Sequence, residues 1–80
     1  MITAEERLAA RDAVGWDVSE HDIKVALQKW TDSTLDGLRA LLDEAVDVFD
    51  AAGGRGVVLA DEIDMLRIAI AVRETREKRG

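Results

Sequence analysis

The chain contains no proline, and its glycines stand mostly between apolar segments rather than inside them. Gly15 follows the first apolar segment, Gly53, Gly54 and Gly56 follow the third, and only Gly37 lies within a helical pattern. Proline and glycine are the residues that most disfavour helix interiors, so this placement is typical of helices with clear ends. It predicts an all-α fold, a single small domain over residues 1–80 with three or four helices.

Polar capping residues mark where the helices are expected to begin. Each is a Thr, Ser or Asp three residues before a carboxylate: Thr3 before Glu6, Ser19 before Asp22, and Asp61 before Asp64. A side chain of this kind accepts a hydrogen bond from a free N–H of the first turn. Gly15 can close the first helix in the left-handed conformation. Residues 57–59, before the last cap, could be briefly extended.

Residues 20–52 can be interpreted as one long helix or as two shorter ones. Residues 31–34, Thr-Asp-Ser-Thr, are poor helix formers and good caps, which favours a break with a new helix starting at Ser33. The apolar phase nevertheless continues from Ile23 through this segment to Ala52. We favour one long central helix, and the two-helix alternative stays open.

The most regular apolar pattern lies between residues 35 and 52. Its members alternate steps of three and four, as in a heptad seam: Leu35, Leu38, Leu42, Ala45, Phe49 and Ala52. A chain of 80 residues buries only about 60% of its unfolded surface, and much of this chain's hydrophobic content is alanine. We therefore predict a homo-oligomer, a dimer, with Leu35, Leu38, Leu42 and Phe49 as its interface. Trp16 and Trp30 are expected to support the core.

The formal net charge is −6, and it is unevenly distributed. Residues 1–64 hold 6 Lys and Arg against 15 Asp and Glu, whereas residues 65–80 hold 5 against 2. The acidic body repels phosphate backbones at long range, which favours a protein partner for the acidic face over nucleic acid. The basic C-terminal tail, about residues 73–80, is expected to fray into solvent.

Three sequence features could carry chemistry, and each has a simpler structural interpretation. His21 has no Cys or second His to complete a zinc site. Four neighbouring carboxylates, those of Asp43, Glu44, Asp47 and Asp50, are typical of a solvated helix face. The segment GGRG at residues 53–56 lacks the Lys and hydroxyl residue of a phosphate-binding loop. We expect neither an enzyme nor a bound metal or cofactor.

The cellular location has few sequence markers. Cys is absent, so no disulfide can form, and the N-terminal segment is acidic where a signal peptide is basic. No apolar run approaches the roughly 18 residues of a membrane span. These observations favour a cytoplasmic protein without a membrane segment.

Taken as short helix, long helix and short helix, the chain resembles the minimal archaeal type of histone fold. The segments that carry the resemblance are RLAARDAVG, VSEHDI and DEAVDVFDAAGGRGVVLADEI, within residues 7–72. The resemblance implies dimerisation through crossed long helices and a pair between Arg55 and Glu62. It also implies DNA contacts through Arg7, Arg11 and Arg55, and the hypothesis of a DNA-binding protein adds the basic tail residues Arg76, Lys78 and Arg79. Val57 stands where the family has a loop threonine.

The sequence thus predicts a non-enzymatic helical module for protein interaction, homodimeric and with an acidic surface for its partner. One alternative is a DNA-binding protein with a histone-like fold. The other is a helix-turn-helix regulator with residues 33–45 as the recognition helix, which would present Asp36, Asp43 and Glu44 to phosphates.

Overall fold

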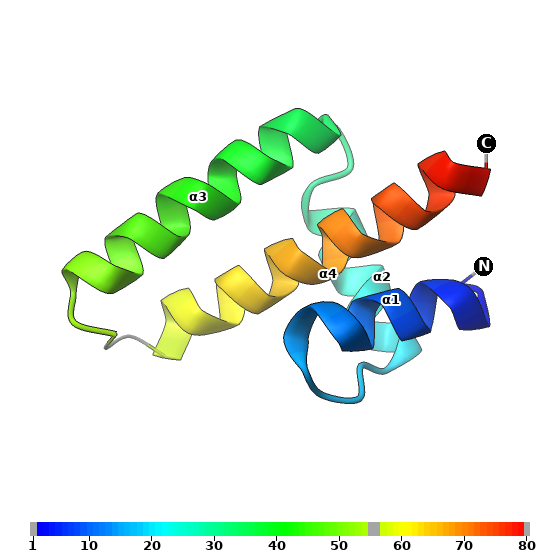
Figure 1. The fold of residues 1–80 in the computed structure, drawn as a ribbon, viewed down its shortest axis with the longest axis horizontal. Coiled ribbons are helices and arrows are strands. Elements are labelled where there is room, and N and C mark those ends of the chain that lie inside the picture. Colours follow the sequence, from blue (N-terminus) through cyan, green and yellow to red (C-terminus); the bar gives the residue numbers. More distant parts are fainter. Residues whose placement is uncertain (1, 55–56, 80) are drawn as a thin grey trace.

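The computed structural model describes residues 2–54 and 57–79, and this part of the chain forms four α-helices and no strand. The helices are α1 (Ala4–Val14), α2 (Glu20–Lys29), α3 (Leu35–Ala51) and α4 (Val57–Arg79) (Figure 1). The predicted all-α class with three or four helices is therefore confirmed.

The predicted ends of α1 and the start of α2 are confirmed. Thr3 and Glu6 form a capping box, in which each side chain accepts a hydrogen bond of 3.1 Å from the other residue's backbone N–H. Gly15 ends α1 with φ at 80°, and its N–H donates to the Arg11 carbonyl over 2.8 Å. Ser19 caps α2 by accepting from the Asp22 N–H over 3.1 Å.

The favoured single helix over residues 20–52 is wrong, because α2 ends at Lys29 and α3 begins at Leu35. The Thr31 hydroxyl donates to the carbonyls of Leu27 (3.3 Å) and Gln28 (2.9 Å), which satisfies the end of α2. Thr34 then caps α3, one residue later than Ser33, by accepting from the N–H of Gly37 over 3.0 Å. These local bonds outweigh the continuous apolar phase. The long central helix that the histone resemblance implies is therefore not formed.

Helix α4 is longer at both ends than the sequence suggests. It begins at Val57, so residues 57–59 are helical rather than extended, and Asp61 is not an N-cap. It also continues to Arg79, so the expected fraying from residue 73 is wrong. The side chain of Arg73 donates to the Ser33 carbonyl, and Arg76 and Arg79 both bind the Glu6 carboxylate. These contacts hold the last turns of α4 against the rest of the chain.

Helix α4 is the centre of the fold, because α1, α2 and α3 all pack against it (Figure 1). The buried core therefore lies along its middle, where α1, α2 and the start of α3 meet it. Its hydrophobic members are Ala10, Val18, Ile23, Ala26, Leu35, Leu38, Ile63, Leu66, Ile68, Ala69, Ile70 and Val72.

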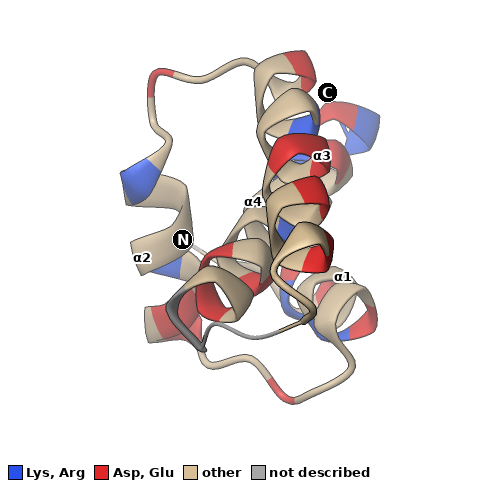
Figure 2. Cartoon of the chain, turned by 90° about the vertical axis from the view of Figure 1, so that its left-hand side faces the viewer, with Lys and Arg blue, Asp and Glu red and all other residues tan. Residues whose placement is uncertain are grey.

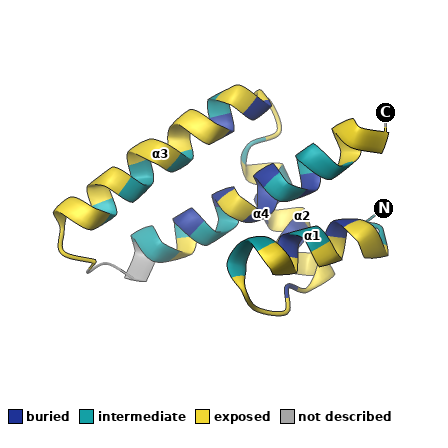
Figure 3. Ribbon diagram, in the orientation of Figure 1, coloured by how far each residue is buried: buried dark blue, intermediate teal, exposed yellow. Residues whose placement is uncertain are grey.

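The end of the molecule near the α3–α4 connection is thinner. There α3 and α4 extend beyond the other two helices, and after Leu38 every residue of α3 is half-buried or exposed (Figures 1 and 3). We refer to residues 40–66, which include most of α3 and the first part of α4, as the hairpin. Towards the α3–α4 connection, the described parts of its two helices pack against each other (Figure 1), whereas α2 reaches the hairpin at Glu62, which pairs with Lys29.

Candidate protein-interaction surface

The hairpin holds the whole excess charge of the chain. Its sequence contains seven acidic residues and one basic residue, a net charge of −6, whereas the remaining residues hold ten of each sign. Four of the acids lie on α3 and are exposed: Asp43, Glu44, Asp47 and Asp50. Figure 2 shows these carboxylate positions following one another along α3. A surface of one sign raises the local concentration of groups of the opposite sign.

Ion pairs neutralise the acids elsewhere far more than those of the hairpin. Arg39 bridges Asp36 (3.2 Å) and Glu74 (3.3 Å), and Lys24 pairs with Glu20 at 3.8 Å. Among the described residues, Glu62 is the one hairpin acid with a cation within 4.0 Å, and that cation is Lys29 at 3.4 Å. The four hairpin carboxylates of α3 therefore face solvent without a described counter-charge.

A groove of about 220 Å³ runs between α3 and α4 on one side of the hairpin. Its apolar lining comes from three helices or their caps: Trp30, Leu41, Ala45, Val48, Leu59 and Leu66. Glu44 of α3 and Glu62 of α4 add carboxylates to it. Leu41 and Val48 are 40% and 53% exposed, which is high for large aliphatic residues in the middle of an amphipathic helix.

The predicted self-association seam is divided by the structure. Leu35 and Leu38 are buried in the core of the single chain, and Leu42 is half-buried against it. Phe49, also half-buried, lines a hollow on the opposite side of the hairpin from the groove. In the single chain, Leu35 and Leu38 thus pack with the core residues of α4 rather than lying free at the surface. Self-association through another surface stays a prediction.

The two tryptophans lie in different environments. Trp30 is half-buried and packs against the core, as expected. Trp16 is 43% exposed in the connection between α1 and α2, so the expectation that it supports the core is wrong. Helix α1 ends at Val14 with Gly15 as its C-cap, so Trp16 belongs to the connection and its side chain lies partly at the surface.

The basic residues predicted to contact DNA do not form one free set. Arg7 and Arg11 are exposed on α1, where they line a shallow hollow that also contains Asp17. Arg76 and Arg79 are bound to Glu6, and Lys78 is exposed. Arg55, and with it the implied pair with Glu62, lies outside the described residues.

Glu6 is the one buried charged side chain among the described residues, with an exposure of 1%. Burial alone raises the pKa of this carboxyl. The hydrogen bond from Arg76 Nε at 2.9 Å, the Thr3 N–H and the charges of Arg76 and Arg79 outweigh burial, so the pKa lies below its ordinary value. The sequence identified Glu6 only as part of a capping box, because its arginine partners lie about 70 residues away.

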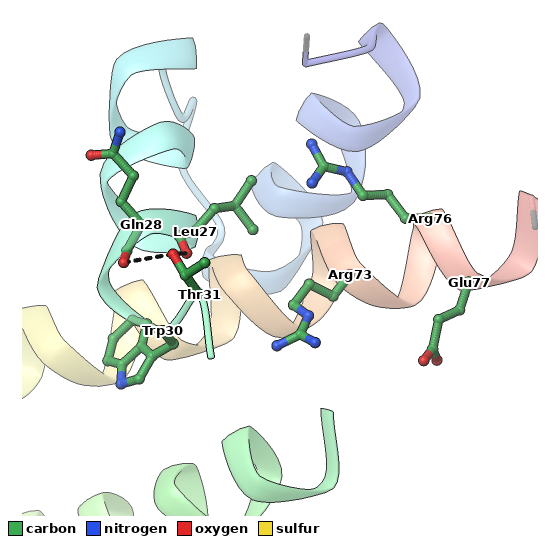
Figure 4. A pocket seen from close by; sticks show the side chains of 7 residues that line it. All are labelled: Leu27, Gln28, Trp30, Thr31, Arg73, Arg76 and Glu77. Atoms are coloured by element: carbon green, nitrogen blue, oxygen red, sulfur yellow. Dashed lines mark hydrogen bonds between the residues drawn. The ribbon is translucent and has the colours of Figure 1, made fainter. Parts of the chain in front are cut away.

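A hollow of about 390 Å³ lies between the end of α2 and α4 (Figure 4). It contains two cationic side chains, but Arg73 donates to the Ser33 carbonyl and Arg76 donates to Glu6. The Thr31 hydroxyl, also in this hollow, is engaged with the end of α2. The two arginines of this hollow therefore hold α4 to the α2–α3 connection and to α1.

No candidate for metal chemistry emerges in the described part of the chain. His21 is exposed in the first turn of α2. Within residues 2–54 and 57–79, no three His, Cys, Asp or Glu side chains gather closely enough to hold a metal ion.

Comparison with protein-family models, curated proteins and solved structures found no match. None of the helices over the described residues combines the length and hydrophobicity needed to cross a membrane. The geometry of the chain itself is therefore the basis for a functional assignment.

Proposed function

We propose that this protein is a non-enzymatic helical interaction module whose hairpin binds a basic segment of a protein partner. The observation that carries the proposal is the confinement of the net charge of −6 to residues 40–66. Four of these acids are exposed along α3, and they have no cation within 4.0 Å among the described residues.

This charge distribution favours a cationic partner at both long and short range. A one-signed surface accelerates encounter with a basic segment, and like-charge contact disfavours acidic partners. Duplex DNA is itself densely negative, so the hairpin repels it. Two of the six basic residues considered for DNA contact are already bound to Glu6. A basic protein segment is thus the partner that the surface fits best.

A homodimer remains a separate prediction, and the charge weighs against forming it at the hairpin. Two hairpins in contact would bring together two surfaces of net charge −6 each. Sedimentation of the purified chain at physiological salt decides this point independently of any partner.

The proposed function is tested by neutralising the α3 acids and measuring affinity for a synthetic Lys-rich peptide. One variant combines Asp43→Asn, Glu44→Gln, Asp47→Asn and Asp50→Asn. The matched control makes the same change of charge at exposed acids elsewhere, with Glu5→Gln, Asp12→Asn, Asp17→Asn and Asp32→Asn. We expect the hairpin variant to bind at least about tenfold more weakly and the control to change by less than about threefold.

Equal losses in the two variants would show that only total charge matters, and would contradict a hairpin site. A DNA gel shift on the same samples adds an outcome. Retardation at low salt that is lost with Arg7→Gln and Arg11→Gln would support nucleic-acid binding in place of the proposed function.

A further inference from the structure

Helix α3 carries a second apolar stripe, beside the one it buries in the core. Leu41, Ala45 and Val48 follow one another at steps of four and three, so they lie on one face of the helix over about 10 Å. All three line the groove between α3 and α4. Ala45 also packs against the core, whereas Leu41 and Val48 leave 40% and 53% of their surface exposed at the groove.

The opposite wall of the groove is also apolar and belongs to α4. Leu59 is half-buried and Leu66 is buried, and both line the groove across from the α3 stripe. Trp30, the residue that ends α2, lies at the same groove and bounds it where the body of the molecule begins. An apolar groove between two helices is a surface on which a third, amphipathic helix can bury its apolar face.

One acidic side chain from each helix also lines this groove. Glu44 on α3 is exposed, and the Glu62 side chain on α4 is 42% exposed. The one described cation at the groove is Lys29, which pairs with Glu62 and lies 5.0 Å from the centre of the Trp30 ring. The Glu62 carboxylate therefore already binds one cation at this end of the groove.

We propose that the groove takes a basic amphipathic helix of a partner protein. This inference rests on the proposed function and specifies the partner segment. Apolar residues of the partner helix, spaced by three and four, enter between Leu41, Val48 and Leu59. Lys or Arg residues flanking that seam reach Glu44 and Glu62. A second copy of this chain is the poorer occupant, because its own hairpin would bring Glu44 and Glu62 against the same carboxylates.

The experiment compares two synthetic peptides of about 18 residues, long enough to form a helix on binding. Both consist of Leu and Lys in the same proportion. In the first the leucines repeat at steps of three and four, and in the second the order is shuffled so that no apolar face forms. Binding is measured by fluorescence anisotropy, and helix formation by circular dichroism. We expect the seam peptide to bind at least about tenfold more tightly and to become helical.

Groove variants are paired with controls of the same chemistry. Leu41→Gln keeps helix propensity and Val48→Gln raises it, and both change side chains that are already partly exposed. Leu8→Gln is the control, since Leu8 is 55% exposed on α1 and lies at another hollow. We expect each groove variant to bind the seam peptide about tenfold more weakly and to bind the shuffled peptide as the parent chain does. The Leu8→Gln control should bind both peptides with the affinity of the parent chain.

Two neighbouring acids give the same comparison for charge. Glu44→Gln changes a groove carboxylate, whereas Asp43→Asn changes one that is turned about 100° away around α3. We expect Glu44→Gln to lower the affinity for the seam peptide by about three- to fivefold and Asp43→Asn to lower it by less than about twofold. Lys29→Gln removes the resident competitor at Glu62 and should tighten binding by about twofold.

The outcomes separate the groove from the proposed function. If the four-acid hairpin variant loses binding while Leu41→Gln and Val48→Gln do not, the groove inference is wrong and the acidic surface stands. If neither set has an effect, both fail. A dimer of the free chain that Leu41→Gln or Val48→Gln dissociates would assign the groove to a second copy and overturn the basic helix as its occupant.

Discussion

Glu6 joins the two ends of the chain through a single carboxylate. Oε1 accepts from the Thr3 N–H in the capping box of α1, and Oε2 accepts from Arg76 and Arg79 in the last turns of α4. A buried carboxylate is stable only when its oxygens are satisfied in this way. The arginine side chains are about 40% exposed, which moderates the strength of the pairs.

Replacing this carboxylate tests its role in stability. We expect Glu6→Gln to lower the free energy of unfolding by about 1–3 kcal/mol at neutral pH, because the charge-assisted hydrogen bonds are lost. Urea denaturation followed by circular dichroism measures the change. Glu5→Gln, at the exposed neighbouring position, is the control and should change stability by less than about 0.5 kcal/mol.

The same carboxylate predicts a pH dependence with a definite sign. The pKa of Glu6 is lower in the folded chain than in the unfolded chain. Its contribution is therefore complete above the unfolded pKa and is lost as the pH falls through the folded one. Denaturation curves at a series of acidic pH values should show a smaller loss of stability for Glu6→Gln than for the parent chain. Parallel curves for the two proteins would contradict this assignment.

A substitution at Gly15 would test backbone strain without steric crowding of the new side chain. Its φ of 80° lies in the left-handed region, yet a Cβ at this position would meet nothing within 4 Å. We expect Gly15→Ala to destabilise the fold by about 1–2 kcal/mol through the backbone alone. Urea denaturation measures this value, and an unchanged midpoint would show that α1 can end without a left-handed residue.

At the scale of elements, the break between α2 and α3 decides the architecture. It lets Trp30 lie at the groove, and it leaves the Ser33 carbonyl free to accept from Arg73. Gly37 belongs to the same local arrangement, because a Cβ there would lie 3.1 Å from the Thr34 hydroxyl oxygen that caps α3. The cap and the glycine that follows it are thus packed against each other.

Thr34→Ala tests the cap that starts α3. We expect a loss of about 1 kcal/mol of unfolding free energy, since the Gly37 N–H loses its acceptor. Thr75→Ala is the matched control, because the Thr75 hydroxyl only donates back to the Ala71 carbonyl within α4. That substitution should cost less than about 0.5 kcal/mol. Equal costs for the two variants would mean that the hydroxyl at residue 34 has no capping role.

For the whole molecule, the charge asymmetry between hairpin and body has a measurable cost. The seven hairpin acids repel one another across two helices, and salt screens this repulsion over about 30 Å at 0.01 M and about 8 Å at 0.15 M. We expect the free energy of unfolding to rise between these salt concentrations. The variant with four neutralised α3 acids should show a smaller rise, whereas the matched four-acid control should respond like the parent.

Features that depend on residues a few positions apart could be predicted from the sequence. The capping box at Thr3 and Glu6, the left-handed cap at Gly15 and the cap at Ser19 each involve partners within four residues. Their hydrogen bonds form wherever the local backbone allows them. The all-α class follows from the same local preferences, and the concentration of acids in residues 40–66 is a property of the sequence itself.

Only the tertiary structure decided which apolar and charged groups are left over. Leu38 and Leu41 are leucines three positions apart on α3, yet the packing of α4 buries Leu38 completely and leaves Leu41 40% exposed. Glu6 meets Arg76 and Arg79 across 70 and 73 residues, a separation at which no local pattern operates. The sequence therefore determined the helices, most of their caps and the acidic segment. The position of α4 determined where the groove lies, because it selects the face of α3 that remains uncovered.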